Sequence, residues 1–292
     1  MVVDAEARLK NLAYLEGNMI KLEHNLTNDI LFKMLFTKYQ ELLKQLVASL
    51  LEFDYRKIEN FIVTNPEIPP EEIGNKFCRL DIKMIVDGKL VNLELQVENE
   101  GNYPERSFYY LARNISTSLE VGQDYKEMPR TIMISILGFS LFPDPQKIHS
   151  EFQMLEVANH RPLTDKVVMH FFELTKLTKE MASDKAWQIW LNLINAKTEE
   201  DLSAIEALEV PVMKEAINAY RRVLTSSEYA EIEHLRHKAD HDEAQALGNA
   251  ERRGAKVERE KWQGVVAELN ASNANKDKLI AKLQEQLKQN SL

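Results

Sequence analysis

The sequence predicts an α/β fold with a mixed sheet in its N-terminal part, followed by a helical C-terminal region with a coiled-coil-like tail. Three observations predict it. Apolar residues recur at helical spacing between residues 18 and 65, a period of two begins after a proline-rich segment at 65–76, and residues 225–292 contain no proline. The first elements are expected in the order helix, strand, strand, helix, strand, as in an α/β domain.

The first helical segment has a recognisable start. Thr27 or Asn28 suits the N-cap position, and the segment DILFKMLFTKYQELLKQLVASLLEF follows at once. Its helical spacing is set by apolar residues, namely Phe32, Leu35, Phe36, Leu42, Leu43 and Leu46. Asp29 and Lys33 stand four residues apart and therefore share one helix face, which is also the arrangement of an ordinary surface salt bridge.

A β-hairpin is expected next. The runs FCRLDIKMIV and KLVNLELQVEN are joined by Asp87-Gly88, a dipeptide that readily adopts positive φ. Leu93, Leu95 and Val97 should face one side of the second strand, while Glu94 and Gln96 face the other.

The remaining elements follow from helix starts and short apolar runs. A helix should run from Pro104 to about Gly122, with Phe108 and Tyr109 in the core, and PRTIMISILGF should be a buried strand. Further strands are expected at 150–158 and 166–174, and helices at 186–196 and 212–224. We divide the chain into residues 1–177 as the sheet domain, 178–227 as a helical region and 228–292 as a charged helical tail.

The tail has the spacing of a coiled coil between residues 262 and 290. Steps of four and three residues alternate through Trp262, Val266, Leu269, Asn273, Lys276, Ile280, Leu283 and Leu287. A homo-oligomer formed through this helix is expected, with Asn273 and Lys276 setting register or partner number; a marginal amphipathic helix is the alternative.

Bulk composition restricts the class of protein. The net charge of −9 argues against indiscriminate coating of nucleic acid, although an acidic protein can still carry one basic groove. The single cysteine, Cys78, excludes an internal disulfide and a metal site built on thiolates. No signal peptide and no membrane span are recognised, so we expect a cytoplasmic protein that does not enter a membrane.

The hairpin also carries the residues most suited to chemistry. Charged side chains between apolar strand residues are costly unless they are paired or bind a cation. Asp81 and Glu94 supply carboxylates from adjacent strands, and such oxygens suit Mg²⁺, with Mn²⁺ as another possible divalent ion. The alternative is an edge strand with a solvated polar face.

Four segments in order resemble one known family. NDILFKMLF, RLDIKMIVDGKLVNLELQVEN, YPERSFYYLARNISTSLEVGQDYKE and ISILGFSLF are similar to the recombination-promoting nuclease and transposase family, a branch of the PD-(D/E)XK nuclease superfamily. The resemblance covers roughly residues 20–180 and implies a restriction-endonuclease-like αβββαβ core. It also implies a catalytic Asp on one strand and Glu-x-Lys on the next.

The resemblance assigns roles to particular residues. The catalytic positions fall on Asp81, Glu94 and Gln96, with Asp81 and Glu94 as metal ligands and Asp29 as a further member of the acidic cluster. Gln96 departs from the general lysine, although the branch commonly has Glu-x-Gln. Glutamine can only hydrogen-bond, so this position lacks the positive charge that a lysine would add. A backbone carbonyl at Leu95 or Val97 is a further metal oxygen that the resemblance suggests.

Basic side chains near this hairpin suit contact with DNA phosphates. Arg106, Tyr110 and Arg113 fall at i, i+4 and i+7 of the expected helix, and Lys33 lies on the first helix. Arg106 pairing with Glu98 or Glu105 is the alternative.

The sequence and the resemblance together predict a Mg²⁺-dependent DNA endonuclease linked to recombination, mobile elements or defence. Two alternatives stay open. One is a decayed nuclease fold that serves as an interaction and oligomerisation module, and the other is a hydrolase of small phosphoesters.

Overall fold

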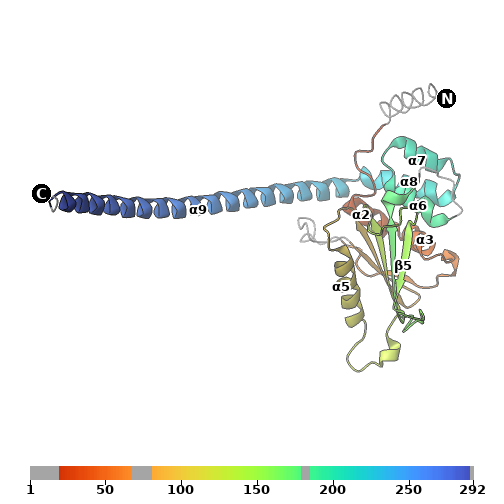
Figure 1. Cartoon of the computed structure of the whole chain (residues 1–292). Helices are drawn as coiled ribbons and strands as arrows, with labels where there is room; N and C mark the ends of the chain where they lie inside the picture. Colours follow the sequence, from red (N-terminus) through yellow and green to blue (C-terminus); the bar gives the residue numbers. More distant parts are fainter. Residues whose placement is uncertain (1–19, 68–80, 179–184, 290–292) are drawn as a thin grey trace, which may run out of the picture. The chain divides into compact units, whose positions relative to one another are not determined.

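The computed structural model describes residues 20–67, 81–178 and 185–289. The chain divides into two compact units, Met1–Leu235 and Arg236–Leu292. The first unit contains a mixed sheet and the helices that pack on it (Figure 1). The second unit contains most of the last helix.

The sheet has six strands in the order β1-β2-β3-β4-β6-β5. β1 to β3 are antiparallel neighbours, β3, β4 and β6 run parallel, and β5 is antiparallel to β6. The strands are β1 Phe61–Val63, β2 Ile82–Val86, β3 Lys89–Gln96, β4 Thr131–Leu137, β5 His149–Gln153 and β6 Val167–Glu173. The expected mixed α/β fold is confirmed, and its sheet is consistent with a restriction-endonuclease-like core.

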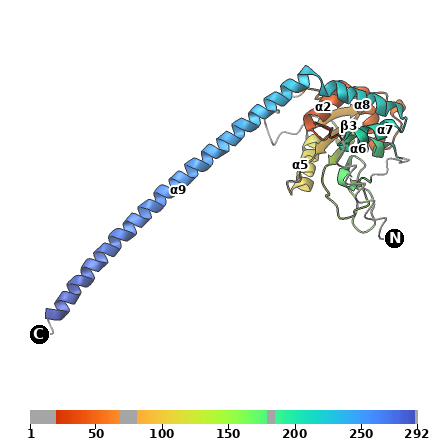
Figure 2. The same cartoon turned by 90° about the horizontal axis from the view of Figure 1, so that it is seen from above.

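Helices occupy the segments between and after the strands. They are α2 Asp29–Lys38, α3 Gln40–Leu50, α5 Tyr103–Ser116, α6 Ala186–Asn195, α7 Glu199–Glu206, α8 Pro211–Leu224 and α9 Ser227–Gln289, with short 3-10 turns at Tyr55–Lys57, Tyr125–Glu127 and Leu174–Lys176. α6, α7 and α8 contact one another and lie together in both views (Figure 1, Figure 2).

The two faces of the sheet are covered differently. On one face, Val91, Leu93 and Leu95 of β3 join the main core with α2, α3, α6 and α8. On the other face, Tyr103 of α5 packs with Leu137 and Phe171 in a smaller cluster. The helical region therefore shares its core with the sheet, and α5 lies alone among the long helices on the opposite face within the described residues (Figure 1).

The expectation that residues 18–65 are mostly helical is wrong at its end. α2 begins after the cap that Asn28 provides, since its side chain accepts a hydrogen bond from Leu31 N at 3.0 Å. The helices end by Leu51, because Glu52 takes a positive φ of 55° and Phe53 N returns to Ala48 O. β1 then supplies the additional strand of an αβββα arrangement.

Two other helical boundaries differ from expectation. α5 ends at Ser116 instead of near Gly122, because the hydroxyls of Ser116, Thr117 and Ser118 donate to the last carbonyls of the helix. α7 was not expected, and it begins with a capping box between Thr198 and Asp201.

α9 is one helix of 63 residues, so the expected helical tail is present (Figure 2). In the part of the chain that the structure describes, no helix has both the length and the apolar content that a membrane crossing requires.

Candidate active site

The β2–β3 hairpin brings the two predicted metal ligands together. Ile82 pairs with Leu93 in antiparallel register, so one residue further out Asp81 stands opposite Glu94. The turn is the expected Asp87-Gly88, with φ of 47° and 74°, as in a type I′ turn. Because the register is fixed by this two-residue turn, the two carboxylates are neighbours on one face of the sheet.

The two carboxylates differ in burial. Glu94 is 2% exposed, and it lies on the face opposite Leu93 and Leu95, which are in the main core. The side chain of Asp81 is 22% exposed, and its Oδ2 lies 3.8 Å from Nζ of Lys83. β3 is therefore buried on both faces around Glu94, and a solvated polar face on an edge strand is not what this segment forms.

Two further oxygens lie on the same face as Glu94. Asn92 precedes Glu94 by two residues, and Ser135 stands opposite Glu94 on β4. Asn92 Oδ1 and Ser135 Oγ are both buried and have no hydrogen-bond partner in the structure. Buried polar atoms are normally satisfied, so these two oxygens mark a place where water or a cation would supply the missing contacts.

This donor set fits a hard divalent cation. Within residues 20–67, 81–178 and 185–289, no three His, Cys, Asp or Glu side chains form a metal-binding group. Mg²⁺ does not need such a group, because it usually takes one or two carboxylates and retains several waters. This coordination preference is compatible with two carboxylates, from Asp81 and Glu94, and with the neutral oxygens of Asn92 and Ser135.

Gln96 follows Glu94 on the same face of β3. Its side-chain amide donates to the backbone carbonyl of Glu98 at 2.8 Å. Gly138, at the end of β4, donates its N–H to the carbonyl of Gln96 at 2.8 Å. A Cβ atom on Gly138 would lie 2.9 Å from Cα of Val97, so only glycine lets the two strand ends approach this closely.

α2 places Asp29 and Lys33 on a helix that contacts β3. Asp29 is the first residue of α2, and its Oδ1 accepts a hydrogen bond from Ile30 N at 3.0 Å. Lys33 is 1% exposed, so an ordinary surface salt bridge is excluded for it. A buried ammonium requires compensating polar contacts, which makes Lys33 part of the internal electrostatics of this unit.

The three predicted phosphate-binding residues of α5 differ in their exposure and in their contacts. Arg106 is mostly buried, forms an ion pair with Glu100, and stacks over the ring of Tyr103 at 5.2 Å. Its Nε and Nη2 atoms are buried without hydrogen-bond partners. Tyr110 is half-buried and packs edge-on against Tyr109, while Arg113 is exposed.

The expectation that Phe108 and Tyr109 are core residues is wrong, because they are 61% and 63% exposed. Tyr103, Ser107 and Leu111 recur every four residues and form the buried side of α5. Phe108 and Tyr109 fall outside that stripe.

Two of the residues at this site were not anticipated. Asn92 was foreseeable, because NLELQ places it on the face of Glu94 and Gln96 by simple alternation. Ser135 was not, since it becomes a neighbour of Glu94 only through the parallel pairing of β3 with β4.

The αβββαβ core, with carboxylates on neighbouring strands of a hairpin, is consistent with a restriction-endonuclease-like fold. A family model described as PD-(D/E)XK nuclease family transposase matches residues 26–250, and the chain belongs to this family. Membership implies nuclease activity and a DNA substrate. Searches of curated proteins and of solved structures gave no significant match.

Proposed function

We propose that this protein is a divalent-metal-dependent DNA endonuclease that acts in recombination, mobile-element movement or defence. The observation that carries the proposal is the buried Glu94 beside Asp81, on a sheet face that also holds the unsatisfied oxygens of Asn92 and Ser135. Family membership supports the same reading.

Asp81 and Glu94 are the residues that would hold Mg²⁺ or Mn²⁺. When bound, such a cation lowers the pKa of a water and stabilises charge on the scissile phosphate. Gln96 would orient the attacking water by hydrogen bonding, without the positive charge that a lysine adds there. Asp29 would add negative charge to the cluster from α2.

Arg113 and Tyr110 would contact DNA phosphates from α5, and Arg106 would do so only after exchanging its contact with Glu100. Lys33 would act through the field of its buried charge, because its side chain is closed to solvent.

The test is cleavage of supercoiled plasmid with Mg²⁺ or Mn²⁺. Asp81→Ala and Glu94→Ala should each lower the nicking rate by about a hundredfold or more, because each removes a metal carboxylate. Glu105→Ala is the matched control, since this exposed carboxylate lies on α5 outside the cluster, and it should nick normally. Nicking that persists in both Asp81→Ala and Glu94→Ala would contradict the proposal.

A decayed nuclease fold used as an interaction module is the second candidate. The net charge of −9 and Gln96 in place of lysine favour it. Titration calorimetry with Mn²⁺ separates the candidates: the endonuclease should bind Mn²⁺ and lose it in Glu94→Ala, whereas the module should bind none.

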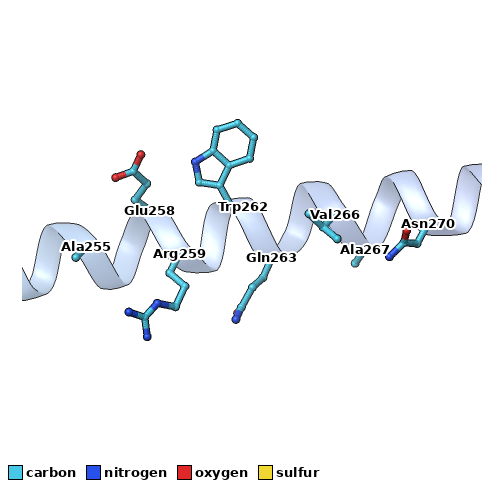
Figure 3. Close-up of a pocket in the computed structure, with 8 residues that line it drawn as sticks. All are labelled: Ala255, Glu258, Arg259, Trp262, Gln263, Val266, Ala267 and Asn270. Atoms are coloured by element: carbon cyan, nitrogen blue, oxygen red, sulfur yellow. The ribbon is translucent and has the colours of Figure 1, made fainter.

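We also propose that α9 joins two copies of the chain. Trp262 and Val266 lie four residues apart on α9, and the side chain of Trp262 points away from the helix (Figure 3). The described apolar seam residues are half or more exposed: Trp262, Val266, Leu269, Ile280 and Leu283. A second copy would cover them, and two active sites in a dimer would allow both DNA strands to be cut.

A further inference from the structure

A pocket lies on the face of the sheet opposite to the face that carries Glu94. It has a volume of about 430 Å³ and is bounded by the end of α3, the 3-10 turn at Tyr55–Lys57, the β2–β3 turn and the first residues of β4. His170 of β6 and Ile132 of β4 form its floor, and Ile132 belongs to the main core. The pocket is therefore separate from the Asp81 and Glu94 site.

Three cationic side chains converge on this pocket from separate elements. Leu90 pairs with Thr131 in parallel register, so Lys89 and Arg130 stand side by side one residue earlier. Lys57 comes from the 3-10 turn. Like charges on adjacent strands are destabilising unless an anion lies between them.

None of these three cations has an acidic partner within 4.0 Å among the residues that the structure describes. Arg130 Nε is also buried and lacks a hydrogen-bond acceptor. A buried guanidinium N–H without an acceptor is costly, which points to an acceptor supplied from outside the chain.

The acidic residues of the pocket are already engaged elsewhere. Asp54 pairs with Arg56 at 2.9 Å, and Asp87 Oδ1 accepts hydrogen bonds from Glu59 N and Asn60 N at 3.0 and 2.8 Å. Glu151 accepts a hydrogen bond from the side chain of Gln153. Each of these carboxylates already accepts a hydrogen bond, so Lys57, Lys89 and Arg130 are the charged donors of the pocket that are left to meet a ligand.

The rest of the lining is neutral or apolar. Burial lowers the pKa of His170 to about 4, so its ring is uncharged at neutral pH, and its Nδ1 lies 3.0 Å from Nε2 of His149. Leu51, Phe53 and Ile58 line the same pocket as the cations. Cationic and apolar side chains in one pocket suit a phosphate joined to a planar organic group.

We propose that this pocket binds the phosphate group of a nucleotide, with Lys57, Lys89 and Arg130 holding the phosphate and Phe53 beside the base. The same chemistry is offered by a free mononucleotide and by the terminal nucleotide of a DNA strand.

Titration calorimetry on the full chain tests the proposal with four probes: inorganic phosphate, dAMP, and a short oligodeoxynucleotide with and without a 5′-phosphate. dAMP should bind more tightly than phosphate alone. Arg130→Gln and Lys89→Gln should each raise its Kd by about tenfold or more, because each removes a charge-assisted contact. Lys214→Gln is the matched control, since this exposed lysine lies on α8, outside the pocket.

If the 5′-phosphate tightens binding of the oligonucleotide, the strand end is the source; if dAMP binds but the 5′-phosphate leaves the affinity of the oligonucleotide unchanged, the free nucleotide is the source. Asp81→Ala should bind dAMP as well as the wild type, which separates this pocket from metal-dependent cleavage. The proposal is overturned if the wild type binds none of the probes, or if Lys89→Gln and Arg130→Gln both bind like the Lys214→Gln control. Should Arg130→Gln fail to fold, Lys89→Gln decides alone.

Discussion

Glu94 and Glu173 are both buried, but the groups around their carboxylates differ. Burial alone therefore does not distinguish a structural glutamate from a catalytic one. Glu173 is fully buried, and its carboxylate accepts hydrogen bonds from Leu141 N and Phe142 N at 2.6 and 3.1 Å. Lys176 Nζ lies 2.6 Å from its other oxygen. Glu173 is thus satisfied by the loop that follows β4, whereas Glu94 lies next to the unsatisfied oxygens of Asn92 and Ser135.

Glu173→Gln should therefore affect stability first. Removing its charge leaves the ammonium of Lys176 buried, and breaking one partner of a buried pair costs about 3–5 kcal/mol. Urea denaturation of the variant and the wild type measures this difference. A change of less than about 1 kcal/mol would show that the pair does not anchor the loop.

The pair of His149 and His170 predicts a pH dependence of stability. Burial lowers the pKa of both imidazoles, and that of His170 falls from 6.5 to about 4. Below pH 6.5 the unfolded chain binds a proton that the native His170 does not, so the free energy of unfolding should fall between pH 6.5 and 4. The difference for His170 corresponds to about 3 kcal/mol.

Denaturation midpoints measured from pH 7.5 to 4.5 check this dependence. His170→Gln should flatten the curve relative to the wild type, and His241→Gln, an exposed position on α9, should leave it unchanged. Identical slopes for the wild type and His170→Gln would contradict the assignment.

At the scale of elements, sequence periodicity identified the parts with strong local signals. The hairpin, α2, α6 and α8 were predictable because a turn dipeptide, a cap or a long amphipathic pattern marks each of them. β1 was not, because three residues are too few for alternation to outweigh the helical pattern before them. The end of α5 depended on hydroxyl groups that compete for its last carbonyls.

The residues of the candidate site also differ in how far the sequence alone predicts their positions. Asp81, Glu94 and Gln96 follow from one hairpin, which local sequence specifies. The buried state of Lys33, the contact of Arg106 with Glu100 and the position of Ser135 depend on packing between distant segments.

A substitution at Gly138 tests whether the close approach of the ends of β3 and β4 positions Gln96. In Gly138→Ala the new Cβ would meet backbone atoms of Val97 at 2.9 Å, so the strand ends must separate. We expect a loss of about 1–3 kcal/mol of stability, measured by urea denaturation, together with slower plasmid nicking.

Gly254→Ala is the control for this substitution. No atom lies within 4 Å of a Cβ added at Gly254, so the change should stabilise its helix by up to about 1 kcal/mol. Equal behaviour of the two variants would show that the approach of Gly138 to Val97 has no structural role.

At the scale of the whole molecule, the coiled-coil seam of α9 predicts how many copies associate. With Leu269 and Leu283 at d positions, Val266, Asn273 and Ile280 occupy a positions. β-branched residues at a with leucine at d favour two parallel strands, and one asparagine at a fixes the register.

Sedimentation equilibrium should therefore give twice the mass of one chain. Ile280→Asp should shift the protein towards the monomer, because it places a charge in the seam. Val257→Asp is the control, since this exposed residue lies outside the seam and should leave the mass unchanged. A wild type that sediments as a monomer at all concentrations would contradict the dimer.

The central claim is that Asp81 and Glu94 hold a divalent metal ion, and the position of a bound metal tests it most directly. A crystal of the protein soaked in Mn²⁺ and measured at the manganese absorption edge should show an anomalous peak between the carboxylates of Asp81 and Glu94. The same measurement on Glu94→Ala should show no peak there. A wild-type crystal with no peak at this hairpin, or with manganese bound only elsewhere, would contradict the assignment of Asp81 and Glu94 as the metal site.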